Sequence, residues 1–233
     1  MAKSVLIFVP AFRGQITAAT FMSSHAICNT LRQSGMACGI NTMSWPDIAE
    51  LRNIALTMWY DTMPTVSHLC FMDDDMGVAP QLLLDMLASG HPLVGALYPQ
   101  RVLPIQFAGS GFGVRAPVKD GFMPVEGVGM GFTLISRVVV REMLEKITGI
   151  SDHRVAPYGA VFGPAGVKRI IRAFDKIDDP ERGWMSEDLS FCRRWRECGG
   201  EVMAATHHRI SHVGQFSFEG CFAEWAKSQQ AAE

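Results

Sequence analysis

The sequence predicts an α/β fold in which a mostly parallel central sheet is flanked by helices, and three observations support this prediction. Residues 4–9, SVLIFV, form a continuous apolar run that ends at Pro10, which is typical of a strand buried on both faces. Strand-like and helix-like segments alternate up to about residue 100, as in parallel doubly wound sheets. Gly-rich mixed segments replace this alternation afterwards, which predicts a smaller mixed region within the same domain.

The helices of the first half are recognised by apolar residues that recur at helical spacing. The first helix is expected over 17–33, with Gly35 as its stop. The second would take Ser44 as its N-cap and hold Pro46 in its first turn. The remaining elements expected before residue 100 are a helix over 79–90 and strands over 36–43, 68–72 and 92–99.

The second half shows fewer clear strands. A helix is predicted over 137–146, and another runs from an N-cap at Ser186 to a stop at Gly199. Residues 149–166 are rich in Gly and Pro, which indicates a mobile segment or the rim of a pocket. The other expected elements are mixed segments over 105–115 and 122–136, a strand over 201–206 and an aromatic packing segment over 216–225.

Composition indicates a soluble, cytoplasmic protein with reduced thiols. The chain has 233 residues, of which 48% are hydrophobic, and this is ample for a buried core. A net charge of −2 excludes an overall basic field that would recruit nucleic acid or anionic membrane. The first apolar run is too short for a secretory signal, and no stretch approaches the roughly 20 apolar residues of a membrane helix. The six cysteines form no CxxC pair, so we expect no disulfide.

The densest negative charge of the chain follows its most strand-like segment. Asp73, Asp74 and Asp75 come directly after HLCFM, where like charges repel and each ion resists desolvation. Two carboxylates in this spacing can bind Mg²⁺ or Mn²⁺ and leave coordination positions for a diphosphate. The alternative is a strand-ending turn whose acids cap the next helix.

Three histidines, His207, His208 and His212, lie in the C-terminal segment THHRISHVG. His212 is the preferred ligand for a Mn²⁺-like cation, and the Val-Gly that follows it allows a close backbone approach to a phosphate. His208 and His212 have the spacing of a helical zinc pair, but neither a helical pattern nor an HExxH motif surrounds them. A separate zinc site is therefore not favoured, and a purely structural role for His212 is the alternative.

Glu187 and Asp188 begin the helix that is expected after Ser186. Acids in a first turn are favoured by the helix dipole and need no functional role. The functional interpretation is a general base, which must be positioned on a firm element at the edge of a pocket.

Six segments follow one another along the chain in the order VLIFVP, ELRN, HLCFMDDDMG, VEGVGMGFTLISR, SEDLSFCRRWRECGG and HVG. This order resembles the catalytic domain of GT-A fold glycosyltransferases, close to the large family 2, over most of residues 4–214. The resemblance implies a Rossmann-like sheet in which residues 1–100 bind a nucleotide-diphosphate sugar and residues 101–233 form the acceptor-side and catalytic half. It further implies that a hexose or pentose moves to an acceptor hydroxyl, with inversion of configuration expected.

The resemblance also implies roles for individual residues. Mn²⁺ or Mg²⁺ would be held by Asp73, Asp75 and His212, with Asp74 beside them toward the sugar nucleotide. Asp188 would be the catalytic base, with Glu187 next to it. The residues expected at the donor nucleotide are Pro10, Ala11, Phe12, Arg13, Arg52 and Asn53. The residues expected on the acceptor side are Gly127, Gly129, Met130, Gly131 and Trp184.

Several alternatives stay open. Arg52 is equally well explained as a solvated helix residue, and Trp184 is better explained by packing against the core. The function could instead be metal-dependent nucleotidyl or phosphoryl transfer, or non-catalytic nucleotide-sugar binding. A retaining enzyme of this fold would not need the base.

The acceptor is not defined by the sequence. The generic expectation is a glycan or lipid-linked glycan, and a modified nucleic acid is a less favoured alternative. Basic residues at 168–172 and 193–196 would suit an anionic acceptor, although a solvated helix face is the simpler interpretation.

Overall fold

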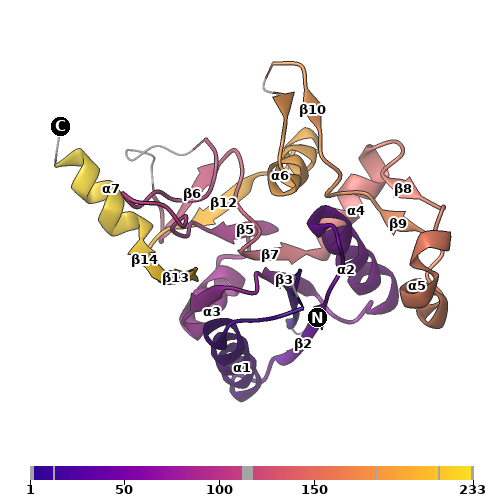
Figure 1. Cartoon of the computed structure of the whole chain (residues 1–233), viewed down its shortest axis with the longest axis horizontal. Helices are drawn as coiled ribbons and strands as arrows, with labels where there is room; N and C mark the ends of the chain where they lie inside the picture. Colours follow the sequence, from indigo (N-terminus) through magenta and orange to yellow (C-terminus); the bar gives the residue numbers. More distant parts are fainter. Residues whose placement is uncertain (1–2, 13, 112–117, 182, 215, 232–233) are drawn as a thin grey trace.

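A seven-stranded sheet forms the centre of the computed structural model, which describes residues 3–12, 14–111, 118–181, 183–214 and 216–231 (Figure 1). In spatial order its strands are β2 (Ala37–Met43), β1 (Ser4–Pro10), β3 (His68–Met72), β7 (Phe132–Ser136), β5 (Leu93–Ala96), β12 (Val202–Ala205) and β6 (Phe122–Val125). All strands except β7 and β6 run in one direction. The predicted α/β fold with a mostly parallel central sheet is therefore confirmed.

Helices cover both faces of this sheet. They are α1 (Ala18–Gln33), α2 (Ile48–Thr62), α3 (Pro80–Ser89), α4 (Arg137–Lys146), α6 (Glu187–Glu197) and α7 (Phe222–Gln230). Successive residues of a strand point to opposite sides, so Val5 and Ile7 of β1 pack in one core cluster with residues of α1 and α3. Leu6 and Phe8 pack in the other cluster with residues of α2, α4, α6 and α7. In Figure 1, α1 and α3 lie below the sheet, and α4 and α6 lie above it.

A second, three-stranded sheet joins distant parts of the chain. It consists of β14 (Ser217–Cys221), β13 (Arg209–Val213) and β4 (Met76–Val78), in that order and antiparallel. In its register His212 lies opposite Met76. Because β4 begins directly after the three aspartates, this pairing brings the C-terminal histidine segment beside the acidic turn.

The segment 149–166, predicted to be a mobile segment or the rim of a pocket, contains regular structure, and its residues 149–154 line a hollow, as the pocket-rim interpretation expects. Its buried Tyr158 and Phe162 pack in a small core cluster with Ile54 of α2, which explains the order of the segment. The short elements in and around it are β8 (Ser151–Asp152), η1 (Ala156–Tyr158), α5 (Gly159–Ala165), β9 (Ile170–Ile171), β10 (Asp178–Asp179) and β11 (Gly183–Trp184).

The second helix begins later than predicted. The N-cap of α2 is Asp47 rather than Ser44, and the Asp47 carboxylate accepts a hydrogen bond of 2.8 Å from the backbone N–H of Glu50. Pro46 therefore precedes the helix instead of lying in its first turn. Both Ser and Asp are good caps, and the residue that can reach the free N–H groups is decided by the path of the loop.

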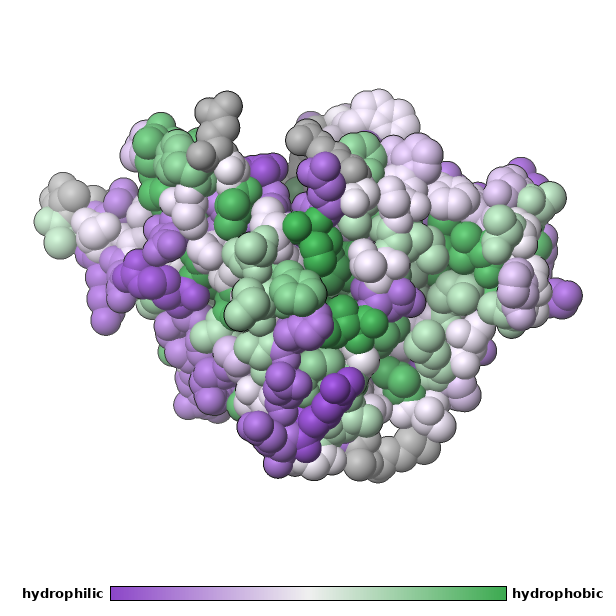
Figure 2. Space-filling view, turned by 60° about the horizontal axis from the view of Figure 1, so that its bottom comes forward, coloured by the Kyte–Doolittle hydropathy of each residue, from purple (hydrophilic) through white to green (hydrophobic). Residues whose placement is uncertain are grey.

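The molecular surface seen from the side of α1 and α3 mixes hydrophobic and hydrophilic side chains (Figure 2). Two hydrophobic side chains of α1, Phe21 and Met22, are 47% and 66% exposed. Within the described ranges, none of the helices has both the length and the apolar character that crossing a bilayer requires. The six cysteines are buried and carry free thiols.

Candidate functional site

The acidic turn lies at the carboxyl end of β3 and is fixed by its backbone. The N–H of Asp73 donates to the carbonyl of Gly131 at 2.9 Å. The buried hydroxyl of Thr20, at the start of α1, donates to the Asp73 carbonyl at 3.2 Å and accepts from the Met76 N–H at 2.8 Å. The N–H of Thr17 donates to the carbonyl of Asp74 at 2.7 Å. These contacts fix the turn through its backbone groups.

The helix-capping alternative for the three aspartates is wrong. The next helix, α3, begins at Pro80 with Ala79 as its N-cap, and β4 lies between it and the acids. The carboxylates therefore do not cap this helix.

His212 reaches the acidic turn across the sheet formed by β13 and β4. Its Nε2 lies 3.3 Å from Oδ2 of Asp75, and its Nδ1 lies 2.9 Å from the carbonyl oxygen of Pro99. A carbonyl can only accept, so Nδ1 donates to Pro99, and Nε2 faces the Asp75 carboxylate. Metal-binding histidines are commonly oriented by such a backbone carbonyl.

Arg52 is buried and links two halves of the site. It is 3% exposed, and it donates to Asp73 at 2.8 Å and to Glu187 at 3.1 Å. Its guanidinium lies 5.9 Å from the ring centroid of Phe71. The explanation of Arg52 as a solvated helix residue is therefore wrong. Burial acts to lower its pKa, but the surrounding carboxylates outweigh burial and raise that pKa.

Glu187 and Asp188 lie at the start of α6, as predicted from the sequence, but they have different surroundings. Glu187 pairs with Arg52, and its pKa is raised mainly by burial while Arg52 opposes this change. Asp188 Oδ1 accepts hydrogen bonds from the hydroxyl of Ser186 and, at 2.9 Å, from the N–H of Leu189. The Asp188 carboxylate is thus oriented by the first turn of its own helix.

Sequence reasoning missed two residues of the site, Tyr98 and Arg101, which follow β5. Arg101 Nη1 donates to Asp75 Oδ2 at 2.9 Å, and its side chain is 51% exposed. The buried Tyr98 ring packs edge-on against the His212 ring, with 5.4 Å between the ring centroids. Burial is the main cause that raises the pKa of Tyr98, and Asp73 is the next. The carboxyl ends of parallel strands meet at one edge of a sheet, so inspecting the residues after β5 as well as those after β3 would have found both.

The carboxylates of the site outnumber its guanidinium groups. Asp73, Asp75 and Glu187 each contact an arginine, and Asp188 also acts on Arg52 through its charge. Two arginines, Arg52 and Arg101, face these four acids. The excess of negative charge favours a bound cation.

The glycines predicted on the acceptor side are buried, and neighbouring protein side chains occupy the space that a Cβ atom would take. A Cβ at Gly129 or Gly131 would lie 2.3 Å or 2.6 Å from atoms of Tyr98, and one at Gly127 would lie 2.6 Å from Leu189. Met130 is 0% exposed and belongs to the hydrophobic core. The close approach that these glycines permit in this structure is therefore to Tyr98 and α6.

The residues predicted at the nucleotide differ in how exposed they are. Pro10 and Ala11 are buried at the end of β1, and Phe12 is 48% exposed. Arg13 lies outside the described residues. Asn53 is fully buried and donates to Asp175 at 2.8 Å while it accepts from the Phe174 N–H at 2.8 Å, so its amide holds the chain around 174–175.

Trp184 is 72% exposed on β11, so the expectation that it packs against the core is wrong. It lines an open hollow of about 350 Å³ together with Asp47, Glu50 and Lys176. An aromatic ring at such a rim offers a flat apolar surface to a ligand.

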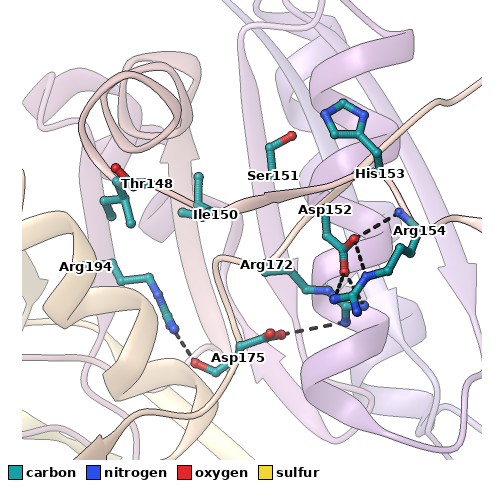
Figure 3. Close-up of a pocket in the computed structure, with 11 residues that line it drawn as sticks. Thr148, Ile150, Ser151, Asp152, His153, Arg154, Arg172, Asp175 and Arg194 are labelled. Carbon is teal, nitrogen blue, oxygen red and sulfur yellow. Dashed lines mark hydrogen bonds and ion pairs between the residues drawn. The ribbon is translucent and has the colours of Figure 1, made fainter.

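A larger hollow, of about 590 Å³, lies away from the acidic turn and shares Arg172 and Asp175 with the first (Figure 3). Figure 3 shows Arg154 and Arg172 both turned toward Asp152. Their Nη2 atoms lie 2.9 Å and 3.4 Å from Asp152 Oδ2. Arg194 donates to the carbonyls of Ala173 and Asp175. Of the predicted basic residues, Arg172 and Arg194 thus have protein partners, while Arg196 of α6 is exposed, which agrees with a solvated helix face.

Comparison with known proteins shows the fold. No family model and no curated protein match the chain. Among solved structures, protein A197 from STIV is similar, with 18% identity and a TM-score of 0.51, covering 92% of this chain and 86% of that one.

Two further similar structures are enzymes with lower scores. A glycosyltransferase involved in the glycosylation of the major capsid of PBCV-1 has 12% identity and a TM-score of 0.34, covering 62% of this chain and 64% of that one. A mutant Drosophila beta-1,4-galactosyltransferase 7 in complex with manganese, UDP-Gal and xylobiose has 16% identity and a TM-score of 0.47, covering 98% of this chain and 80% of that one. These scores are too low to support an argument, and the comparisons thus show the α/β fold shared with protein A197.

Proposed function

We propose that the chain is a metal-dependent glycosyltransferase of the GT-A type that moves a sugar from a nucleotide-diphosphate sugar to an acceptor hydroxyl. The observation that carries this proposal is the contact of His212 Nε2 with Asp75 Oδ2, at 3.3 Å. Next to it, the buried Arg52 forms ion pairs with both Asp73 and Glu187. These five residues belong to the six sequence segments that resemble such enzymes. Residues 1–100 would bind the donor, and residues 101–233 would supply the acceptor side and the base.

The donor atoms fit Mn²⁺ or Mg²⁺. Asp73 and Asp75 would offer carboxylate oxygens and His212 its Nε2, a set that suits Mn²⁺ better than Mg²⁺ because of the imidazole. When bound, such a cation stabilises negative charge on the departing nucleoside diphosphate as a Lewis acid. Arg101, which is half exposed and contacts Asp75, would be able to bind a phosphate of the donor.

Arg52 would act through the carboxylates that it orients. Its two ion pairs hold Asp73 and Glu187 in fixed positions in a buried setting, and such preorganisation is what a metal and donor site requires. Asp74 and the chain after β1, with the exposed Phe12, would then lie toward the sugar nucleotide.

Asp188 would accept the proton of the attacking acceptor hydroxyl if the enzyme inverts configuration. Its carboxylate is oriented by Ser186 and Leu189, whereas Glu187 is engaged by Arg52. The exposed ring of Trp184 would supply a stacking surface for a sugar acceptor. A glycan is therefore the acceptor class that we propose.

The test is a thermal-shift screen of nucleotide-diphosphate sugars with and without Mn²⁺, followed by donor hydrolysis in the absence of acceptor. A ligand that binds the native state alone raises its stability with occupancy. We expect one donor class to stabilise the protein only with Mn²⁺, and Asp75→Asn to abolish that shift. Stabilisation by nucleoside triphosphates instead would point to nucleotidyl transfer, and donor binding without hydrolysis or transfer would point to a binding module.

A further inference from the structure

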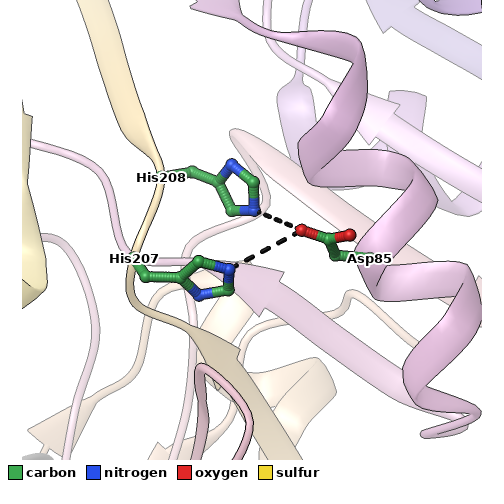
Figure 4. A group of neighbouring side chains, drawn as sticks. All are labelled: Asp85, His207 and His208. Atoms are coloured by element: carbon green, nitrogen blue, oxygen red, sulfur yellow. Dashed lines mark hydrogen bonds and ion pairs between the residues drawn. The ribbon is translucent and has the colours of Figure 1, made fainter.

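A second cluster of metal-ligating side chains lies outside the candidate active site, at Asp85, His207 and His208 (Figure 4). Asp85 belongs to α3, and the two histidines belong to the bend between β12 and β13. One ligand atom from each of the three residues lies within 4.8 Å of the others. Figure 4 shows both imidazoles turned toward the same carboxylate.

Two of the three distances between the ligand atoms are close to those around a tetrahedral cation. Asp85 Oδ2 lies 2.9 Å from His208 Nε2 and 3.6 Å from His207 Nε2. Ligands bound at 2.0–2.1 Å in a tetrahedron are about 3.3 Å apart, so the two observed distances bracket the expected value. Small side-chain rotations would complete the arrangement.

The groups around the cluster orient its ligands as in known metal sites. Gln81 Nε2 donates to Asp85 Oδ1 at 2.7 Å, which leaves Oδ2 to face the imidazoles. His207 Nδ1 lies 3.2 Å from the carbonyl oxygen of Gly121, which can only accept, so Nδ1 donates there and Nε2 faces Asp85. Such outer partners fix the tautomer and the ring orientation of metal-binding histidines.

The backbone is also shaped to admit His207. A Cβ at Gly121 would lie 2.0 Å from His207 Nδ1, and Gly121 has a φ of +83°, which side-chain-bearing residues rarely adopt. The side chains of His208, Asp85 and His207 are 13%, 29% and 40% exposed. The cluster is thus open on one side, where a water can act as fourth ligand and a cation can enter.

We propose that Asp85, His207 and His208 form a second metal site that binds Zn²⁺ or a similar transition-metal ion. Two imidazoles and one carboxylate are a typical protein ligand set for Zn²⁺ and are poorly suited to Mg²⁺. The site is distinct from the one at His212, because four residues of extended chain separate His208 from His212 by about 13 Å. A bound ion would join α3 to the start of β13, the strand that carries His212, and would steady that strand.

The experiment is a Co²⁺ titration of the full chain, followed by the visible absorption that tetrahedral Co²⁺ gives, and then by displacement with Zn²⁺. His212→Gln serves as the background, so that the first site loses its imidazole. In this background we expect one equivalent of Co²⁺ to give a tetrahedral spectrum that Zn²⁺ abolishes. His25→Gln, a change at an exposed histidine of α1, should leave both results unchanged.

His208→Gln and His207→Gln, each in the same background, test the ligand set. We expect each change to weaken Co²⁺ binding by more than about 100-fold, because loss of an outer partner alone costs about 10- to 100-fold. The His207 change keeps the contact between Asp85 and His208, so it separates loss of a ligand from loss of folding. Retention of the tetrahedral spectrum in both variants, or its absence from the background protein, would overturn the proposal.

Discussion

At the scale of single residues, the site depends on side chains that hold one another. Asp75 contacts both His212 and Arg101, while Asp73 contacts Arg52. An arginine beside each aspartate positions its carboxylate, but only Arg52 is buried. The two arginines should therefore differ in their importance for stability.

Replacement of Arg52 by Met should lower the free energy of unfolding by about 3 kcal/mol, because it leaves two partly buried carboxylates without their counterion. Arg101→Gln is the matched control, and as a half-exposed ion pair it should cost less than about 1 kcal/mol. Urea unfolding of both variants measures the difference. Equal losses of unfolding free energy would show that the buried ion pairs of Arg52 stabilise the fold no more than the exposed ion pair of Arg101.

Replacement of Asp188 by Asn should lower turnover by about 100- to 10,000-fold, the usual contribution of a general base, with donor affinity nearly unchanged. Asp178→Asn, a change at an exposed acid of β10, is the control. Steady-state kinetics with the donor found in the screen provides the measurement. An unchanged turnover in Asp188→Asn would fit a retaining enzyme, in which this base is not needed.

At the scale of elements, α1 fixes the acidic turn through one hydroxyl. Thr20→Val should cost about 1–3 kcal/mol, since it leaves the buried N–H of Met76 with only a long contact of 3.4 Å to the Asp73 carbonyl. Thr30→Val, on the same helix, removes a hydroxyl that bonds only within α1, and should cost less. Thermal unfolding of the two variants compares the costs, and a larger loss in Thr30→Val would contradict this role of Thr20.

The strand that carries the aspartates also begins with a titratable group. Burial lowers the pKa of His68 from 6.5 to about 4. The unfolded chain therefore binds a proton that the folded chain does not, and stability should fall as the pH drops from about 6.5 to about 4, by up to about 3 kcal/mol. His68→Asn should flatten this part of the profile in urea unfolding, whereas His25→Asn should not. A profile that His68→Asn leaves unchanged would show that this group does not cause the loss.

At the scale of the whole molecule, local periodicity was enough to predict most elements. The helix over 137–146 and the strand over 68–72 have the predicted bounds. The buried face of a helix or strand is determined by the spacing of apolar residues that are close together in the sequence. The cap of α2 and the order of 149–166 were not predictable in this way. Both depend on contacts with residues far along the chain, such as the packing of Phe162 on Ile54.

In the candidate site, too, features set by local sequence could be predicted, whereas those set by long-range contacts could not. The acidic turn and the start of α6 are visible as local charge patterns, so their place at strand and helix ends could be predicted. The environment of Tyr98, the burial of Met130 and the exposure of Trp184 are set by tertiary packing. The pairing of β13 with β4, which brings His212 to Asp75, is likewise long-range, and the ordered resemblance to an enzyme family was the signal that suggested it.

The most direct test of the central claim is a Mn²⁺ titration of the full chain followed by electron paramagnetic resonance. His208→Gln is the background, so that the second site does not contribute. The account predicts one Mn²⁺ bound per chain in this background, and at least about tenfold weaker binding when His212→Gln is added, with His25→Gln as the neutral addition. Equal Mn²⁺ affinity with and without the imidazole of residue 212 would contradict the account.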